Sequence, residues 1–316
     1  MLARSVKRTL SIVGAGRVGR TLGKRLREHG WRIAAVVTRS AATSRAAVRA
    51  IGAGSPLVAK VDVPRQGTAL AVPKGVKKPG ASAPEVDAIL AADLILFATP
   101  DDELPRIAQS LAKLGGSAWR GKIALHTSAT LDRPALAPLA RLGAATGSLH
   151  PMQAFGGEIV PKLKGVIFAI EGDARARRVA RSIAKSLGGI PIAIDTHDKP
   201  VYHAAAVMAG GSLYPVIEAG LQLLIGIGFA RDRATQTLLP LARQILDNIE
   251  RIGPRAAWTG PLSRGDYTIF AKHVRALRRY PREIQQAYAA LALLAGRVLA
   301  KNPAAALKRI NRALEV

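Results

Sequence analysis

The stretch Thr9-Leu-Ser-Ile-Val-Gly-Ala-Gly-Arg-Val-Gly-Arg20 decides the fold of this chain. Its first five residues are mostly apolar or β-branched, as in a short buried strand. Three glycines follow in the spacing G-x-G-x-x-G, and then Val18, Leu22 and Leu26 recur at helical spacing. The pattern predicts a strand, a tight turn and a helix, which is the frame in which this glycine motif binds a dinucleotide.

Each glycine of the motif has an expected role. The first permits the tight turn, the second lets a pyrophosphate approach the backbone, and the third lets the helix pack closely on the strand. Amide groups at the start of the helix then meet the phosphate charge. We therefore expect the cofactor phosphates to be bound by Gly14, Gly16, Arg17, Val18 and Gly19.

The residues after the second apolar run indicate which dinucleotide is bound. NAD enzymes usually place a carboxylate there for the ribose hydroxyls. This chain instead has Thr38, Arg39 and Ser40. A guanidinium offers a planar fork of donors that matches phosphate oxygens, so the sequence favours NADP(H). A further cofactor contact is expected from Thr99, Pro100 and Asp101, which follow another strand; these residues also fit an ordinary helix cap.

The first 195 residues alternate between apolar strands and amphipathic helices. Strands are expected at Thr9–Val13, Trp31–Thr38, Asp93–Ala98, Lys122–His126, Ala144–Leu149, Val166–Ile170 and Pro191–Ile194. Helices are expected at Arg17–His29, Ala41–Gly52, Asp102–Leu114 and Ala174–Leu187. Continuous apolar strands between helices predict a Rossmann-type, doubly wound and mostly parallel sheet that is covered on both faces.

Two segments depart from this alternation. Residues 54–84 are rich in Pro, Gly, Ala and Lys, and we expect a basic, mobile surface insertion there. After residue 195 the strand signal ends, and helices are expected at Leu238–Ile252, Asp266–Arg279 and Glu283–Ala300. The sequence thus predicts an NADP-binding domain over residues 1–195 and an all-α substrate or dimerisation domain over residues 196–316.

Composition narrows the functional class. The chain contains no cysteine, which excludes thiolate metal sites and a cysteine nucleophile, and we expect no metal. The net charge of +26 attracts any polyanion, so we expect nucleic acid to bind only non-specifically. No apolar signal core follows the basic first residues, which favours a cytoplasmic protein. The apolar stretch Ala204–Phe229 fits a buried helix pair at a domain or dimer core better than a membrane span.

Candidate catalytic groups lie at strand ends and at the start of the helical region. His126, an expected substrate contact, and Ser128 close one expected strand, and His150 closes the next. All three can therefore face the crevice expected to hold the nicotinamide. Lys199 and His203 are four residues apart, which puts them on one face of a helix. A lysine of lowered pKa could donate a proton to a carbonyl oxygen, whereas a solvated helix start is the simpler alternative.

Several longer motifs resemble a known family. The sequence is similar to bacterial Rossmann-like proteins with a conserved C-terminal domain of unknown function, related to the ketopantoate reductase and 6-phosphogluconate dehydrogenase group. The matching stretches are Gly14–Gly19, Ala98–Asp101, His126–Ala129, Ser148–Phe155, Tyr202–Ala206 and Thr259–Asp266 with His273. The resemblance implies a Rossmann domain, a helical domain that usually dimerises, and an oxidoreductase activity.

The resemblance also implies site residues. In related hydroxyacid dehydrogenases and ketopantoate reductases a lysine and an asparagine four residues later hold the substrate oxygen; Lys199 fits, but His203 replaces the asparagine. The chain has Gly210-Gly211 where the family tends to have Ser-Asn, and the basic insertion is an addition. Prephenate and arogenate dehydrogenases place a serine and a His-Pro pair at spacings similar to Ser128 and His150. The motif likeness further implies substrate contacts by Gln153, Arg264 and Asp266.

Three functions remain open from the sequence. The first is NADP(H)-dependent reduction of a small anionic carbonyl substrate, a ketopantoate-like 2-keto acid, by a homodimer. The second is a prephenate-type or imino-acid dehydrogenase that uses His150. The third is a non-catalytic protein that senses NADP or binds nucleic acid, with Arg275, Arg279 and Arg282 on one helical face; scarce aromatic residues count against it.

Overall fold

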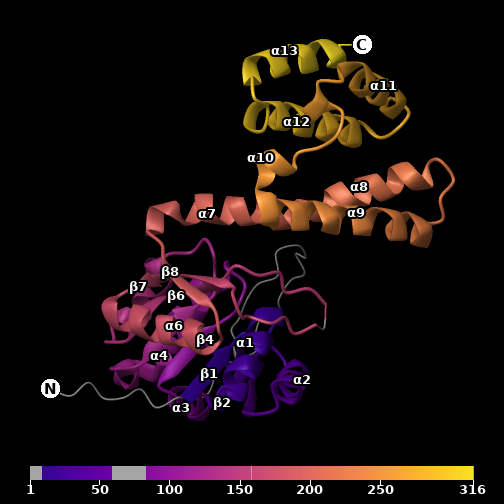
Figure 1. Cartoon of the computed structure of the whole chain (residues 1–316). Helices are drawn as coiled ribbons and strands as arrows, with labels where there is room; N and C mark the ends of the chain where they lie inside the picture. Colours follow the sequence, from indigo (N-terminus) through magenta and orange to yellow (C-terminus); the bar gives the residue numbers. More distant parts are fainter. Residues whose placement is uncertain (1–8, 59–82, 158, 316) are drawn as a thin grey trace, which may run out of the picture. The chain divides into compact units, whose positions relative to one another are not determined.

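The computed structural model describes residues 9–58, 83–157 and 159–315. The chain divides into two compact units, Met1–Met208 and Ala209–Val316 (Figure 1). The division lies later in the chain than the boundary expected near residue 195. Helix α7 (Lys199–Ala206) stays with the sheet unit because Lys199 and Tyr202 form hydrogen bonds to residues of a strand.

Within the described residues, the first unit holds one eight-stranded sheet in the order β3-β2-β1-β4-β5-β6-β7-β8. Neighbouring strands are parallel except for β6 and β7, which are antiparallel. The order reverses between β1 and β4, which creates a ligand-binding crevice at the carboxyl ends of these strands. The strands are β1 (Thr9–Val13), β2 (Arg32–Thr38), β3 (Ser55–Val58), β4 (Leu94–Phe97), β5 (Ile123–His126), β6 (Ala145–Pro151), β7 (Ile167–Gly172) and β8 (Ile190–Ala193).

Helices cover both faces of this sheet, so the expected Rossmann-type fold is confirmed. On one face, Leu94 and Leu96 pack in a core with α1 (Arg17–Glu28), α2 (Ala41–Ile51) and α6 (Ala174–Ser186). The alternate residues Ile95 and Phe97 pack on the other face. The helices of that face are α3 (Ala83–Leu90), α4 (Leu104–Gly115) and α5 (Ala137–Ala140). Because every residue of β4 is buried, the strand carries apolar side chains on both faces.

The region expected to be a basic insertion needs a correction. Its beginning is not irregular, because Ser55–Val58 forms β3 and pairs with β2 at the edge of the sheet. Its last residues, Ala83 and Pro84, begin helix α3, which is not among the helices expected from the sequence. Residues 59–82 lie outside the described residues, and so does the expectation of mobility there.

The second unit is helical in its described residues, as expected. Its helices are α8 (Leu213–Ile225), α9 (Arg231–Ile252), α10 (Pro254–Ala257), α11 (Tyr267–Leu277), α12 (Arg282–Val298) and α13 (Pro303–Leu314). Helices α11, α12 and α13 lie together (Figure 1). Buried Phe270, Ala292 and Ile310 join them in a small core. Helix α13 was missed, although its start carries a clear signal: the Asn302 side chain accepts a hydrogen bond from the Ala305 amide.

Within the single chain, Ala204–Phe229 is not a buried helix pair, and its expected burial at a dimer core stays a prediction. The segment lies up to Ile225 in one helical run, Thr196–Ile225, which includes α7, a π-helical turn at Val207–Gly211 and α8. Only 6% of its most apolar window is buried. By length and composition alone this run could cross a membrane, which is weak evidence when only one such helix is found.

Candidate active site

A pocket of about 350 Å³ lies at the crevice between β1 and β4. It is lined by the ends of β1, β2 and β4 and by the starts of α1 and α4. This is the position at which a doubly wound sheet binds a dinucleotide. The lining residues are Val13, Gly14, Ala15, Gly16, Arg20, Val37, Thr38, Arg39, Thr43, Ala46, Ala98, Thr99, Pro100, Glu103 and Ile107.

The three glycines of the motif have three different environments. Gly14 has a φ of +88°, and a Cβ there would meet the Ala98 carbonyl oxygen at 2.6 Å. A Cβ on Gly19 would meet the Gly14 carbonyl oxygen at 2.3 Å. A Cβ on Gly16, by contrast, would meet nothing within 4 Å, and Gly16 lines the pocket. The first and third glycines are thus required by packing, whereas Gly16 leaves the space that a pyrophosphate needs beside the backbone.

The adenosine end of the pocket carries the groups expected to select NADP(H). Arg39 lines this end, and its side chain is 77% exposed. Thr38 lines it as well, with its hydroxyl donating to the Ser40 carbonyl. The Ser40 hydroxyl accepts from the Thr43 amide and so caps α2. The guanidinium of Arg39 is therefore the candidate partner of a 2′-phosphate at this end.

The pocket also contains residues that the sequence analysis missed. Arg20 lies one helical turn after Arg17 and lines the pocket, whereas Arg17 itself does not. Thr43 lies in the first turn of α2, and Glu103 lies at the start of α4. The signal for all three is their position within one turn of a helix that starts at the carboxyl edge of the sheet. Val18 is half-buried and packs against the core instead of the pocket.

Thr99 and Asp101 follow β4 and have different surroundings. The Thr99 hydroxyl is buried and has no hydrogen-bond partner among the described residues, in the lining of the dinucleotide pocket. The carboxylate of Asp101 accepts hydrogen bonds from the hydroxyls of Ser128 and Thr130, each at 2.7 Å. Ser128 also accepts from the amides of Thr130 and Leu131. Ser128 and Asp101 thus join the ends of β4 and β5 at the edge next to the pocket.

Lys199 is the least exposed of the candidate catalytic groups after His126. It is 2% exposed, and its Nζ lies 3.2 Å from Glu171 on β7 and 3.3 Å from the Ser148 hydroxyl on β6. It also donates to the Leu131 carbonyl. An ammonium has three donors, so these three acceptors use all of them. Burial lowers the pKa of Lys199, and the carboxylate of Glu171 opposes that shift.

His150 lies at the end of β6 and forms a pair with a residue of α7. Its Nδ1 is 3.0 Å from the hydroxyl of Tyr202, and the two rings are edge to face. Burial, followed by the nearby charges of His203 and Lys199, lowers the pKa of His150 to about 4. Burial raises the pKa of Tyr202 to about 12. At neutral pH the pair is therefore an uncharged imidazole bonded to an uncharged phenol.

His126 at the end of β5 is 1% exposed. Neither ring nitrogen makes a hydrogen bond of normal geometry with another described residue. Burial, followed by the charge of Lys199, lowers the pKa of His126 to about 3, against weaker opposing effects of the Asp101 carboxylate and then of the Asp132 backbone. His126, His150, Lys199 and Asp101 thus act electrostatically on one another at one edge of the sheet, as expected for a shared site.

The remaining expected substrate contacts are Gln153, Arg264 and Asp266. Gln153 is exposed and uses its side-chain oxygen on the Ala154 amide. Arg264 and Asp266 belong to the helical unit, where the Asp266 carboxylate caps α11 through the Ile269 amide. Their role in substrate binding stays a prediction. The same holds for His203, which is half-buried on α7.

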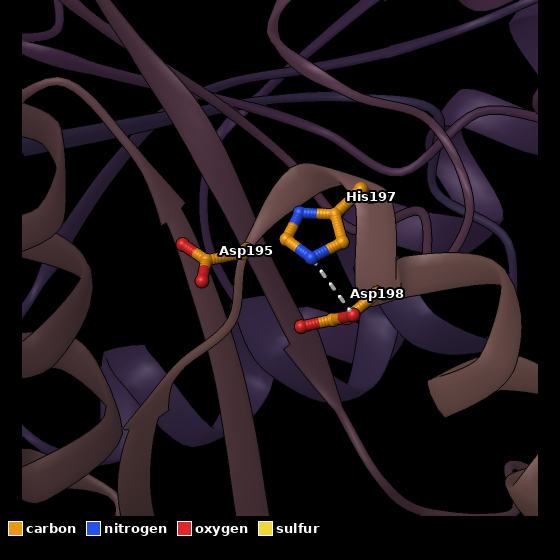
Figure 2. A group of neighbouring side chains, drawn as sticks. All are labelled: Asp195, His197 and Asp198. Atoms are coloured by element: carbon orange, nitrogen blue, oxygen red, sulfur yellow. Dashed lines mark ion pairs between the residues drawn. The ribbon is translucent and has the colours of Figure 1, made fainter.

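Three possible metal ligands follow β8 on one turn, Asp195, His197 and Asp198 (Figure 2). Their ligand atoms lie within 4.8 Å of one another, but all three residues are exposed. His197 Nε2 and Asp198 Oδ1 already form a pair at 3.1 Å. Because no buried ligand accompanies this turn, it carries no assignment of a metal site.

Comparisons with known proteins agree with this geometry. Residues 76–151 match a Rossmann-like domain, and residues 166–295 match a domain of unknown function, DUF2520. No curated protein sequence matches the chain. The expected combination of a Rossmann domain and a C-terminal domain of unknown function is confirmed, whereas the relation to ketopantoate reductases stays a prediction.

Solved structures share the fold at low identity. A putative NADP oxidoreductase from Bacteroides fragilis is 20% identical with a TM-score of 0.67, and the match covers 90% of this chain and 95% of that one. Protein TM1727 from Thermotoga maritima is 18% identical with a TM-score of 0.60, covering 97% and 98%. A reductive aminase from Aspergillus terreus is 16% identical with a TM-score of 0.61, covering 96% and 99%.

The geometry of Gly16 gives a first prediction. Gly16→Ala should leave the melting temperature unchanged, because its Cβ meets nothing, but should weaken NADPH binding on the order of tenfold by occupying the space beside the amides. Fluorescence titration measures the affinity. Gly156→Ala, which also adds a methyl group in open space, is the matched control. Equal affinities for both variants and the unmodified protein would contradict the assigned role.

The buried imidazole gives a second prediction. The pKa of His126 is lowered in the folded state, so the unfolded chain binds a proton first as the pH falls below about 6.5. When the pH falls from about 7 to about 5, proton binding by His126 in the unfolded chain should therefore lower the free energy of unfolding by about 2 kcal/mol. Urea unfolding at the two pH values measures this loss. His126→Leu should reduce it, and an equal loss in both proteins would disprove the burial of a neutral ring.

Proposed function

We propose that this protein is an NADP(H)-dependent oxidoreductase that reduces the C=N bond of a small imino acid. The observation that supports this proposal is the protonation and hydrogen bonding of the side chains that could donate a proton at the carboxyl edge of the sheet. Lys199 has three acceptors, the lowered pKa values of His126 and His150 keep both rings neutral, and Tyr202 has a raised pKa. In the described part of the sheet unit, no group of this set is a ready proton donor at neutral pH.

The two substrate classes left open by the sequence differ in whether the protein must supply a proton. Hydride addition to the C=O bond of a 2-keto acid leaves an alkoxide, which needs a proton from a positioned acid. An iminium ion arrives with its proton and becomes a neutral amine when it accepts hydride. A site with neutral imidazoles and an occupied lysine therefore suits C=N better than C=O. This reasoning favours the imino-acid alternative over the ketopantoate-like substrate.

Local charge also supports a cationic reacting group. Lys199 is paired with Glu171, whose carboxylate offsets part of the ammonium charge. The carboxylate of Asp101 raises the pKa of both histidine rings by its charge. A negative group near an iminium nitrogen stabilises the charged form. Asp101 is therefore a candidate for holding the substrate in its protonated state.

His150 is the residue that we assign to the substrate nitrogen. When its Nδ1–H donates to the Tyr202 hydroxyl, Nε2 is left as an acceptor for an N–H group. In this tautomer Tyr202 orients the ring, in the way that a second group orients a catalytic histidine. In this proposal His150 is catalytic, and Lys199 is a positioning residue that holds α7 against β6 and β7.

The cofactor pocket fits NADP(H). Gly16 leaves room beside the backbone, the unpartnered Thr99 hydroxyl offers a donor within the pocket, and Arg39 faces the adenosine end. NADPH, when bound, supplies the hydride. Solved structures that share the fold include a reductive aminase and a 1-pyrroline-5-carboxylate reductase, and a 1-pyrroline ring contains a C=N bond, which supports the proposal.

The substrate class is tested by comparing cyclic imino acids with 2-keto acids of equal size, following NADPH oxidation. We expect turnover with imino acids at least tenfold above that with keto acids. His150→Phe should lower kcat about a hundredfold with an unchanged Kd for NADPH, because the acceptor for the substrate nitrogen is lost. Tyr202→Phe, which removes only the tautomer partner, should have a smaller effect. Faster turnover of keto acids would disprove the proposed class, and NADPH binding without turnover of either would favour an NADP sensor.

We also propose that the protein is a homodimer joined through its helical unit. On α9, Leu241, Ile245, Ile249 and Ile252 are all more than a third exposed and recur at helical spacing. On α8, Tyr214 is 69% exposed. Soluble monomers rarely expose contiguous apolar faces of this kind. A second copy of the chain would cover this stripe of α9.

Sedimentation measures the oligomeric state. The unmodified protein should be a dimer, and Leu241→Arg together with Ile245→Arg should convert it to a monomer, because two charges would be buried in the interface. Ile159→Arg is the control, since Ile159 is 81% exposed in the sheet unit. A monomeric unmodified protein at all concentrations would contradict the assignment.

A further inference from the structure

The adenosine end of the dinucleotide pocket contains a carboxylate that an NADP(H) site does not need. Glu103 lines this pocket from the start of α4, on the wall opposite the end of β2. Its side chain is only 11% exposed. Its single ion pair in the described structure is with Arg39, at 3.1 Å from Nη1 to Oε1. A mostly buried carboxylate is thus held in place by one largely exposed guanidinium.

The contact between the two side chains places the carboxylate close to the ribose substituent. Arg39 follows β2, where dinucleotide-binding folds recognise the 2′ position of the adenosine ribose. Because Glu103 touches the guanidinium of Arg39, its oxygens lie within one contact of whatever that guanidinium binds. A ribose 2′-hydroxyl could donate to such a carboxylate, whereas a 2′-phosphate is repelled by it.

We propose that Glu103 makes this pocket accept NADH as well as NADPH, by supplying from α4 the ribose acceptor that the end of β2 lacks. The inference rests on the proposed function. Arg39 serves the 2′-phosphate, and Glu103 serves the 2′-hydroxyl. When one of these two side chains binds the cofactor, the ion pair between them still compensates the charge of the other side chain. Glu103 is thus a specificity-determining residue that reduces the preference for the phosphorylated cofactor.

Glu103→Gln tests the inference, because glutamine keeps the size of the side chain and removes its charge. Affinities for NADPH and NADH are measured by fluorescence titration of the full-length protein. The variant should bind NADPH about fivefold more tightly and NADH about twofold more weakly. The Kd for NADH divided by the Kd for NADPH should therefore rise on the order of tenfold. Glu103→Ala, which should shift the ratio in the same direction, is the second variant if glutamine impairs folding.

Asp102→Asn is the matched control. It removes the same charge one residue earlier, at an exposed position that does not line the pocket, and should leave the ratio unchanged. An unchanged ratio in Glu103→Gln would overturn the inference. So would a variant that loses affinity for NADPH more than for NADH, because Glu103 would then only orient Arg39 for the phosphate.

The two proposals fail in different ways. If the unmodified protein binds neither cofactor, the proposed oxidoreductase function is wrong. If it binds NADPH and the Glu103→Gln ratio does not rise, the function stands and only the role of Glu103 is wrong.

Discussion

The buried ion pair between Lys199 and Glu171 is the interaction on which the site depends. It joins β7 to the first residue of α7, and through the Ser148 hydroxyl it also reaches β6. Breaking a buried pair by removing one partner typically costs about 3–5 kcal/mol, because a charge is left without compensation. The pair therefore fixes where α7 begins, and with it the position of Tyr202 beside His150. The same ammonium also helps to keep both imidazoles neutral.

This pair explains why a lysine at the expected place need not act as an acid. A catalytic lysine needs a free proton directed at the substrate, and burial alone does not provide one. Here the three acceptors around Nζ use its donors inside the protein. The chemical task then passes to neighbouring groups, and the electrostatic state of those groups decides which substrates are suitable. At the ends of these strands, the protonation states of the side chains thus limit which substrates can react more than the shape of the site does.

Local patterns in the sequence were sufficient for much of the fold. The glycine turn, the apolar strands and the amphipathic helices each carry their signal within about a dozen residues, and the parallel sheet follows from their alternation. Contacts between distant residues could not be read in this way. No residue close to Lys199 in the sequence predicts its contact with Glu171, and none close to Arg39 predicts its contact with Glu103. The edge strand β3 was missed because Ser55–Val58 carries a proline and lies beside a Gly-rich and Lys-rich stretch.

The tight packing of Gly14 and Gly19 has a consequence for how this pocket can change over time. At these two positions any side chain would collide with backbone, so the phosphate end is closed to variation. The adenosine end is formed by side chains on two separate elements, β2 and α4, which can be exchanged without disturbing the turn. Evolution, or an engineer, can therefore retune the choice of cofactor at one end while the other remains an invariant anchor.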